Sequence, residues 1–348
     1  MDLELFEFSP HVAAEWDTFV IQSSFGSIHQ ISAWKKFQEQ IPGRKKVFGL
    51  GVRKNGKIVA TVLCVQMQTG RFGQYWWYSA RGPVFDPQKE EKAGIFLMQE
   101  ACKKLGNVGG MFWRVDPYFS ISQEKCVFPK TDLPIKTVTQ NYQPTDTLII
   151  DLKKTNDEIL SEMKRKGRYN ITLAQKKGIL ITTIENGKIT ERDIDDFWNL
   201  NMETTSRDKF SGHEKSYYKK LLQSLDEYAV LFFAEYEGSR IATAISTFCG
   251  EKAIYYFGAS TSHSEFRNLM APYLLQWEMM QYAKKRGCTS YDFLGIAPEN
   301  DLHHPYAGIS DFKWKFGGSR HTFSPGQEIV LNPFWYSLYR FVKRRKKL

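Results

Sequence analysis

The chain has 348 residues, of which 42% are hydrophobic and 15% aromatic, and its formal net charge is +10. This length favours two domains, and the apolar content excludes a disordered or low-complexity protein. The charge favours an anionic partner, so nucleic acid, a nucleotide-linked substrate and an anionic lipid surface are all candidates. A basic enzyme without such a partner explains the charge equally well, and composition leaves both interpretations open.

Five cysteines are scattered along the sequence without a metal-binding spacing, which is typical of reduced thiols in a cytoplasmic protein. The N-terminus does not resemble a signal peptide, and no run of about 18 apolar residues is present to span a membrane. We therefore expect a cytoplasmic protein. Residues 334–348 place an aromatic amphipathic helix before five basic residues in six. This tail suits either peripheral contact with the inner face of the cytoplasmic membrane or packing as a final helix with a solvated end.

The first half of the chain predicts a strand at residues 3–8 and then two helices, at 12–22 and 32–40. An Asn55-Gly56 turn indicates a hairpin between strands at 48–52 and 58–67. This half ends with a strand, a helix and a strand, at 75–79, 91–105 and 111–115.

The second half repeats this order of elements. Helices are predicted at 191–205, 214–225 and 269–286, and strands at 230–236, 241–248, 253–258 and 290–295. The halves align first at an offset of 182, which pairs Gly56 with Gly238, and later at 179, which pairs Phe112 with Tyr291. We infer an internal duplication. The repeated unit resembles the GNAT acyltransferase fold, whose sheet splays apart to admit an acyl donor and an amine; two generic α/β domains are the alternative.

A basic helix is predicted between the repeats, at 155–177, after a strand at 147–152. Thr155 is its N-cap, and Glu158 occupies the capping-box position. Its basic residues are Lys164, Arg165, Lys166, Arg168, Lys176 and Lys177. Two interpretations stay open: a linker helix with a solvated side, or a face that contacts the phosphates of RNA or of a pyrophosphate.

Residues 291–319 begin as a buried strand and continue as a long polar loop. The loop ends in residues 312–318, which gather aromatic side chains, two lysines and paired glycines. Long loops inside compact domains are more often functional than idle. We therefore expect this stretch to form a wall of the active site.

Familiar catalytic signatures are missing. The sequence has no nucleophile elbow, no zinc-protease motif and no nucleotide-binding glycine loop, so we expect no covalent nucleophile, metal or cofactor. Acetyl-CoA enzymes of the GNAT fold hold pyrophosphate on a glycine-rich turn that opens the helix after the central strand. Residues 265–272 occupy that position without a glycine, and residues 81–84 of the first repeat are equally unsuited. The acyl donor is therefore expected to be something other than CoA.

Short motifs along the whole chain resemble the FemABX family, the aminoacyl-tRNA-dependent transferases that extend peptidoglycan precursors. No single motif is diagnostic, but their order and spacing together are. They are Ala80-Arg81-Gly82-Pro83, Arg114-Val115-Asp116-Pro117, Lys166-Gly167-Arg168-Tyr169-Asn170-Ile171, Glu203-Thr204 with Arg207 and Phe210, Tyr256-Phe257-Gly258-Ala259, Met270-Ala271-Pro272-Tyr273, and Asp292-Phe293-Leu294-Gly295-Ile296 with Gly308, Phe312-Lys313 and Phe316-Gly317-Gly318.

The resemblance implies an α/β (α+β) protein of two tandem GNAT-like acyltransferase domains that arose by internal duplication. It implies a precursor-side domain at residues 1–146 with 325–348 and a catalytic domain at residues 147–324. Longer relatives insert a coiled-coil arm, whereas residues 191–225 leave no room for one, so this chain resembles the compact members.

The implied reaction is aminolysis of an ester. An amine on a peptidoglycan stem peptide attacks the carbonyl that links an amino acid to the tRNA ribose. The implied partners are aminoacyl-tRNA, as co-substrate, and a UDP-linked or lipid-linked muramyl pentapeptide. The chemistry needs positioning and oxyanion stabilisation rather than a nucleophile. The alternative is a CoA- or carrier-dependent N-acyltransferase on the same duplicated fold.

Lys313 matches the family lysine that stabilises the oxyanion, and Phe312 beside it is the candidate for stacking on the terminal adenosine. Lys315 would point the other way if this segment is extended. Asp116, at the end of a strand, is the candidate general base. The alternatives are that Asp-Pro forms a turn and that the amine loses its proton to substrate or water.

Arg207 matches a family position that contacts the phosphate or carboxylates of the precursor, and Lys36 matches a family lysine that binds its nucleotide part. Tyr256 lies on the central strand of the second domain, where a GNAT sheet splays, and its hydroxyl is the candidate for holding a phosphate of the precursor. For each of these residues, and for Phe312, an ordinary structural role remains the alternative, such as a solvated lysine, a surface ion pair or a core aromatic.

Overall fold

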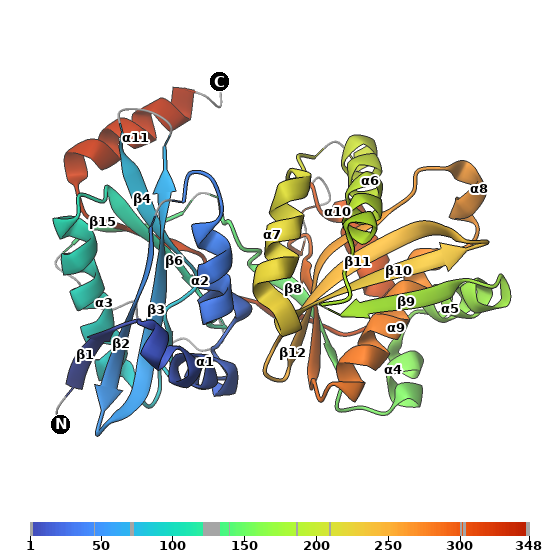
Figure 1. Ribbon diagram of the computed structural model, residues 1–348, viewed down its shortest axis with the longest axis horizontal. Coiled ribbons are helices and arrows are strands. Elements are labelled where there is room, and N and C mark those ends of the chain that lie inside the picture. The colour runs from blue at the N-terminus through green and yellow to red at the C-terminus, as the bar shows by residue number, and fades with distance from the viewer. Residues whose placement is uncertain are drawn as a thin grey trace. The chain divides into compact units, whose positions relative to one another are not determined.

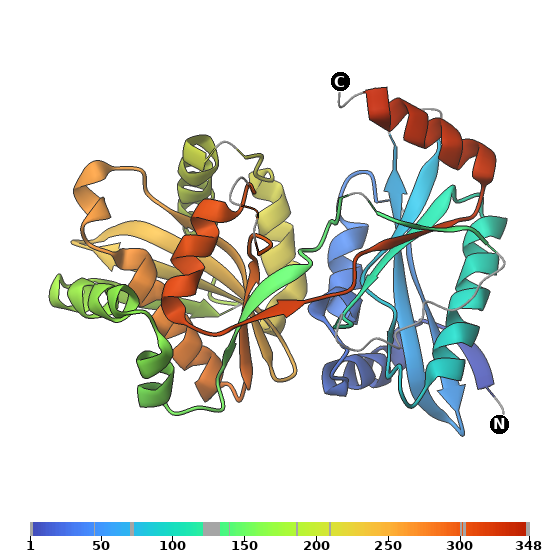
Figure 2. The ribbon, with the colours of Figure 1, turned by 180° about the vertical axis from the view of Figure 1, so that it is seen from behind.

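The structure is a computed structural model that describes residues 3–44, 46–69, 73–120, 133–138, 140–185, 187–208, 210–299, 301 and 304–345, with the side chains of 344 and 345 excepted. The chain divides into two compact units, residues 1–145 with 322–348 and residues 146–321. Each unit is a mixed β-sheet with helices on both faces (Figures 1 and 2).

The sheet of the first unit has the strand order β1-β2-β3-β4-β6-β15-β7, with β5 paired to β3. Neighbours are antiparallel except for the central pair β4 and β6, which is parallel. The last long strand, β15, comes from the C-terminal part of the chain. The strands are β1 (Leu3–Glu7), β2 (Val47–Lys54), β3 (Lys57–Gln68), β4 (Tyr75–Arg81), β5 (Val84–Phe85), β6 (Phe112–Pro117), β7 (Ile135–Thr137) and β15 (Gln327–Val330).

Helix α3 (Glu91–Asn107) covers one face of this sheet, and α1 (Ala13–Gln22) with α2 (Ser32–Glu39) covers the other (Figure 1). The apolar positions of α3 recur at helical spacing and pack on β2 and β3, whose inward side chains alternate as a strand requires. Trp16, Trp77 and Trp113 are fully buried in this unit. Helix α11 (Pro333–Arg345) follows β15 and packs through Tyr336 on Phe112.

The sheet of the second unit has the order β14-β8-β13-β12-β11-β10-β9. Its parallel pair is β12 and β13, the counterparts of β4 and β6 in the first unit. The strands are β8 (Asp146–Asp151), β9 (Leu180–Glu185), β10 (Ala229–Tyr236), β11 (Ser239–Cys249), β12 (Lys252–Ser260), β13 (Ser290–Gly295) and β14 (Ser319–Thr322).

Helices α6 (Glu191–Asp208) and α7 (Lys215–Leu225) cover one face of the second sheet. Helices α5 (Arg165–Lys176) and α9 (Ala271–Lys285) cover the other (Figures 1 and 2). The core under α9 is continuous from β8 to β10 and includes Phe232, Tyr291 and Phe293. The shorter helices are α4 (Asn156–Glu162), α8 (Ser264–Arg267) and α10 (Ala307–Lys313).

Two matching hairpins carry the duplication into three dimensions. Gly56 lies at φ 76° between β2 and β3, and Gly238 lies at φ 78° between β10 and β11. The residues before them, Asn55 and Glu237, also have positive φ, so both turns have the twist that suits a tight hairpin.

Every strand and helix expected in the two repeats is present within a few residues. The single helix expected at 155–177 is wrong. Met163 and Lys164 are extended, at ψ 147° and 145°, and separate α4 from α5. The break arises because the amide of Lys164 donates to the carbonyl of Lys315 instead of continuing the helix. The guanidinium of Arg168 then donates to carbonyls at the end of α4, those of Leu160, Ser161 and Met163.

The segment around Lys313 is not extended, so the argument from strand alternation does not apply to Lys315. Residues 307–313 form α10, and a 3₁₀ turn, η4 (Trp314–Phe316), continues it, so the long loop contains helical structure. Helix α10 packs Phe312 against Tyr273, and η4 packs Phe316 into the core. Within the described ranges, no helix combines the length and apolar character that crossing a bilayer requires.

Candidate active site

The second sheet opens between its two parallel strands. β12 and β13 pair over three positions, from Lys252 with Ser290 to Ile254 with Asp292, and then part. β12 continues to Ser260 on β11, while β13 continues to Gly295 on β8 after a register shift. The backbone therefore splays where its strands end, as an acyltransferase site of this fold requires.

A cavity of about 520 Å³ lies in this unit, beside the free end of β12. Its wall is built from α6, β11, β12, α8, the first turns of α9, and α10. Its lining includes Thr204, Arg207, Ser260, Met270, Tyr273 and Phe312. The wall mixes apolar side chains with a few polar groups, the usual make-up of a small-molecule site.

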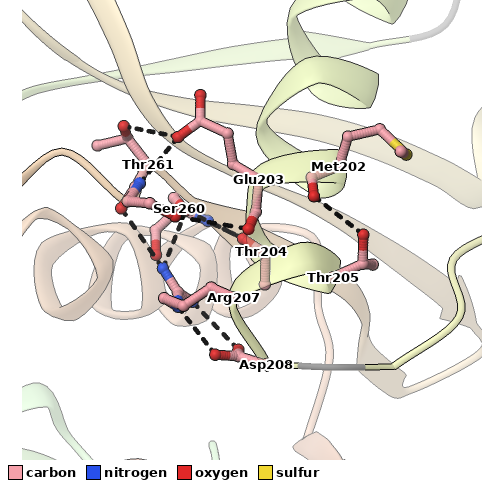
Figure 3. Close-up of polar contacts among 9 residues, drawn as sticks. Met202, Glu203, Thr204, Thr205, Arg207, Asp208, Ser260 and Thr261 are labelled. Carbon is pink, nitrogen blue, oxygen red and sulfur yellow. Dashed lines mark hydrogen bonds and ion pairs between the residues drawn. The ribbon is translucent and has the colours of Figure 1, made fainter.

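At the rim of the cavity, hydrogen bonds join the end of α6 to the end of β12 (Figure 3). The hydroxyl of Thr204 donates to the carbonyl of Ser260 at 3.0 Å and accepts from its amide at 2.9 Å. The carboxylate of Glu203 accepts from the Thr261 hydroxyl at 2.9 Å and from the Ser262 amide at 2.8 Å. These bonds fix the strand end in place of a neighbouring strand.

Arg207 extends from the same helix end and lines the cavity. Its guanidinium donates to Asp208 at 2.8 and 3.1 Å and to the carbonyls of Ser260 and Thr261 at 3.3 and 3.4 Å (Figure 3). The pair with Asp208 raises the pKa of Arg207, so the group is a permanent cation. A fixed guanidinium at a cavity rim is suited to phosphate or carboxylate.

Helix α9 begins at the cavity without a glycine-rich turn. Its N-cap is Met270, in the left-handed region at φ 57°, and Pro272 lies in its first turn. Pro272 has no amide hydrogen, and the bulk of Met270 keeps a ligand from the helix end. The first turn of α9 is therefore a poor cradle for the pyrophosphate of CoA.

Lys313 lies at the end of α10, one residue after the cavity-lining Phe312, and does not itself line the cavity. Its side chain is buried, and Nζ donates to the carbonyl of Gly295 at 2.6 Å. Burial lowers the pKa of Lys313 to about 8, and the nearby carboxylate of Asp292 opposes that fall. Near neutral pH the group is therefore mainly an ammonium, with further N–H donors for an oxyanion.

Asp292 fixes the backbone at the end of β13, where the carbonyl of Gly295 accepts from Lys313. Its carboxylate accepts from the amide of Leu294 at 2.7 Å, and Leu294 lies at φ 57°, a conformation that a branched residue rarely adopts. A second lysine, Lys252, lies at the start of β12, where β12 still pairs with β13. Burial lowers its pKa to about 8 as well, and Asp292 again opposes the fall.

The paired glycines after η4 let the chain turn back against the sheet. Gly317 and Gly318 lie at φ 77° and 83°, and a side chain at either would meet the backbone of Glu162 or of Ile149. The expected wall of the active site is thus held between α4 and β8, with Phe312 turned to the cavity.

The other predicted residues lie elsewhere. Tyr256 is half-buried on β12 and packs on Phe257, but it is not among the cavity-lining residues. Lys36 is exposed on α2 and Asp116 is buried on β6, both in the first unit. Asp116 accepts from the Tyr78 hydroxyl at 2.6 Å and from the Arg81 amide at 2.7 Å, and burial raises its pKa.

Sequence reasoning overlooked Asp292 and the pair Glu203 and Thr204 as functional groups, although all three lay inside the motifs quoted for the family. Their signal was available in part. An acidic residue in a buried strand needs a partner, and Asp292 in the run 290–295 has no basic residue nearby in sequence. Its carboxylate accepts from the Leu294 amide, and Lys313, whose pKa its charge raises, comes from a helix that the sequence pattern did not predict.

The comparison with known proteins begins with one family. The sequence model described as "FemAB family" matches residues 12–133, 131–240 and 235–344. A lipid II:glycine glycyltransferase of Staphylococcus aureus (strain MRSA252) is 23% identical, covering 95% of this chain and 94% of the relative. The Staphylococcus epidermidis protein of the same name is 26% identical, covering 94% of each.

Solved structures agree on the fold. The crystal structure of FemX covers 96% of this chain and 99% of its own, with a TM-score of 0.84 at 20% identity. A tandem GNAT protein from the clavulanic acid pathway covers 95% and 99%, with a TM-score of 0.53 at 10% identity. The predicted fold class, two tandem GNAT-like domains in a mixed α/β chain, is confirmed.

Proposed function

The chain belongs to the FemAB family, and we propose that it is an aminoacyltransferase that moves an amino acid from aminoacyl-tRNA to a side-chain amine of a peptidoglycan precursor stem peptide. The product is a branch of the interpeptide bridge in the cell wall. Two relatives that align along almost the whole chain carry the name lipid II:glycine glycyltransferase, which supports both the reaction and the class of acceptor.

One observation carries the choice of donor. The cavity lies where a GNAT sheet receives its acyl donor, yet the helix that opens there begins with Met270, Ala271 and Pro272. A CoA donor needs free amides at this helix end for its pyrophosphate. An aminoacyl ester on a ribose has no pyrophosphate, so the site suits this donor better than it suits CoA. An acyl group on a carrier also lacks a pyrophosphate, so a carrier-dependent N-acyltransferase stays the alternative.

In the proposed reaction the neutral amine of the acceptor attacks the ester carbonyl carbon. A C–N bond forms, the tetrahedral oxyanion collapses, the C–O bond to the ribose breaks, and the proton lost by the amine ends on the ribose oxygen. Lys313 supplies the ammonium that stabilises the oxyanion and the departing ribose oxygen. Phe312, at the cavity wall beside it, supports the terminal adenosine by stacking.

We assign the anionic groups of the precursor to Arg207, Tyr256 and Lys36. Arg207 is the best supported of the three because its guanidinium lines the cavity and is held by four acceptors. The role of Asp116 as general base stays a prediction. Its two hydrogen bonds to β4 favour a structural role over proton transfer.

The acceptor is either UDP-linked or lipid-linked, and helix α11 favours the lipid-linked form. Phe334, Leu338 and Phe341 are 70%, 36% and 53% exposed and follow each other at intervals of four and three residues on one side of the helix. Residues 343–347 add a basic run, of which 346 and 347 lie outside the described residues. An exposed apolar stripe with basic neighbours suits peripheral contact with anionic lipid.

A transfer assay with charged tRNAs tests the function. We expect transfer to a lipid-linked or UDP-linked pentapeptide from at least one aminoacyl-tRNA, and none from acetyl-CoA. Consumption of acetyl-CoA with no transfer from any charged tRNA would establish the alternative instead. Sedimentation with phosphatidylglycerol vesicles tests α11: the variant Phe334→Ser/Phe341→Ser should bind them at least about tenfold more weakly than the unaltered chain.

A further inference from the structure

Helix α5 carries a concentration of positive charge that the proposed chemistry does not use. Residues 164–177 contain six Lys and Arg and not one Asp or Glu. An exposed helix usually mixes charges and forms pairs at a spacing of three or four residues. On α2, by contrast, Lys35 pairs with Glu39. A helix without any acid forms no such pairs, so it is built for an external anion or simply for solvent.

The exposed side of α5 is a straight stripe, Arg165, Tyr169, Thr172 and Lys176, which we call the α5 stripe. These residues follow at i, i+4, i+7 and i+11, so they lie on one side of the helix along about 16 Å. Lys166 is exposed next to Arg165, and Tyr169 is 63% exposed. Within the described part of the chain, none of these cations has an acidic partner.

Arg168 shows what a structural arginine looks like on the same helix. Its guanidinium turns back and donates to the carbonyls of Leu160 and Ser161, which end α4. It therefore serves the fold and is not part of the α5 stripe. Arg165, Lys166 and Lys176 have no such role, and the burial of Gly167, Asn170 and Ile171 shows that the opposite side of α5 already holds the helix in place.

Helix α5 belongs to the same unit as the cavity, and its buried side, opposite the α5 stripe, contacts the cavity wall. Gly167 lies against the backbone of Lys315, two residues after Lys313, and a side chain at Gly167 would overlap it. Farther along α5, Asn170 faces Tyr273, a cavity-lining residue, and a hydrogen bond between them opposes the rise in the Tyr273 pKa that burial causes. A long anion that enters the cavity at one end therefore has α5 as the adjoining basic surface.

Resting on the proposed function, we infer that the α5 stripe is the docking surface for the stem of the donor tRNA, outside the terminal nucleotides that enter the cavity. Lys and Arg at this spacing neutralise successive phosphates, and an exposed tyrosine offers a face for a sugar or base. A lipid surface fits α5 poorly, because Tyr169 is the single large apolar side chain exposed on its described stripe.

The test compares two triple variants of the full chain with the same loss of charge. Arg165→Gln/Lys166→Gln/Lys176→Gln removes the α5 cations. Lys57→Gln/Lys92→Gln/Lys136→Gln removes three exposed lysines of the first unit and is the matched control. Binding of labelled, uncharged tRNA is measured between 50 and 200 mM salt. We expect the α5 variant to bind about 10- to 100-fold more weakly, with a salt slope smaller by about 3, and the control to bind within about twofold of the unaltered chain.

A second readout separates the surface from the chemistry. Transfer is measured from full aminoacyl-tRNA and from a 3′-aminoacyl trinucleotide C-C-A, which keeps the ester but lacks the stem. The α5 variant should lose kcat/KM with the full donor and keep it with the trinucleotide. Equal losses with both donors, unchanged tRNA binding, or lost binding to anionic vesicles in place of tRNA would each overturn the inference. If the unaltered chain transfers from neither donor, the proposed function fails, while tRNA binding still decides the surface.

Discussion

The two sheets open at the same strand but on opposite sides of it. In the first unit, β4 stays paired with β6 over five positions, from Trp77 with Trp113 to Arg81 with Pro117, and leaves β3. In the second, β12 stays with β11 along its length and leaves β13 after three positions. In both units the central strand therefore separates from one neighbour. In the first unit β4 separates from β3, and in the second β12 separates from β13.

What fills each opening decides its use. In the first unit the buried side chain of Gln30 bridges the parted strands, accepting from the Leu63 amide at 2.8 Å and donating to the Ala80 carbonyl at 2.7 Å. β5 pairs with β3 in the space beyond. In the second unit no such plug is found among the described residues, and the free end of β12 borders the cavity. The first unit, whose opening is filled, is the closed copy and supports the fold. The second unit, whose opening borders the cavity, is the open copy and can hold a substrate.

The sharpest test of the open copy is Lys313→Met. We expect kcat to fall by about 10²- to 10³-fold, as on removal of an oxyanion donor elsewhere. The melting temperature should stay level or rise, because methionine fills the same space without a buried charge. Both are measured on the purified variant, by the transfer assay and by calorimetry.

Lys252→Met is the matched control for that substitution. Lys252 is a half-buried lysine that Asp292 also influences, but it lies at the paired start of β12, away from the opening. Its loss should leave kcat within about threefold, since it has no contact with the reacting ester. Equal loss of activity in both variants would show that the Asp292 neighbourhood matters for folding and that Lys313 has no special place at the oxyanion.

Much of this fold could be predicted from the sequence, because local patterns determine it. Apolar and β-branched runs mark β3 and β11, helical spacing marks α3 and α9, and the turns at Gly56 and Gly238 mark the hairpins. The break between α4 and α5 could not be foreseen. The capping signal at Thr155 and the apolar spacing both favour one long helix, and only a contact with Lys315, some 150 residues away in sequence, ends it.

The site was harder to predict for the same reason. Lys313 and Phe312 were named through family motifs, but neither their helix nor the contact of Lys313 with Gly295 follows from residue pattern. The left-handed Leu294, which turns the end of β13, breaks the local rule for branched residues. Such exceptions are held by tertiary contacts, here the bond from its amide to Asp292, so sequence patterns give no sign of them.

A second test of the open copy removes the guanidinium at its rim. Arg207→Ala should raise KM for the precursor about 10- to 100-fold, with a smaller change in kcat, because a charged hydrogen bond to an anion is lost on binding. Arg192→Ala is the control on the same helix, since its side chain is 84% exposed and its ion pair with Asp196 is a loose 3.8 Å contact. If KM rises for the aminoacyl-tRNA alone, Arg207 binds the donor and not the precursor.

The pH profile gives a third test, because the acceptor amine must be neutral while Lys313 is protonated. The acceptor amine must be neutral, which makes kcat/KM rise about tenfold per pH unit below its own pKa near 10. The Lys313 ammonium is lost above its pKa of about 8, so the rise should level off there. In Asp292→Asn the level region should begin at lower pH, because the carboxylate that holds the proton on Lys313 is gone. An unbroken rise to pH 10 in both proteins would exclude the ammonium from the chemical step.

The smallest effect on rate is expected in the closed copy, from Asp116→Asn. One carboxylate oxygen ties the Arg81 amide and the other the Tyr78 hydroxyl, so Asp116 on β6 clamps β4 at the end where its second-unit counterpart runs free. Asparagine keeps one acceptor and loses the other, which should lower the free energy of unfolding by about 1–3 kcal/mol.

The value of kcat should change by less than about threefold if proton transfer does not involve this residue. Denaturant unfolding and the transfer assay on the same preparation decide between the two roles. Full stability with a hundredfold loss of kcat would make Asp116 the general base, and the closed copy would then belong to the catalytic machinery.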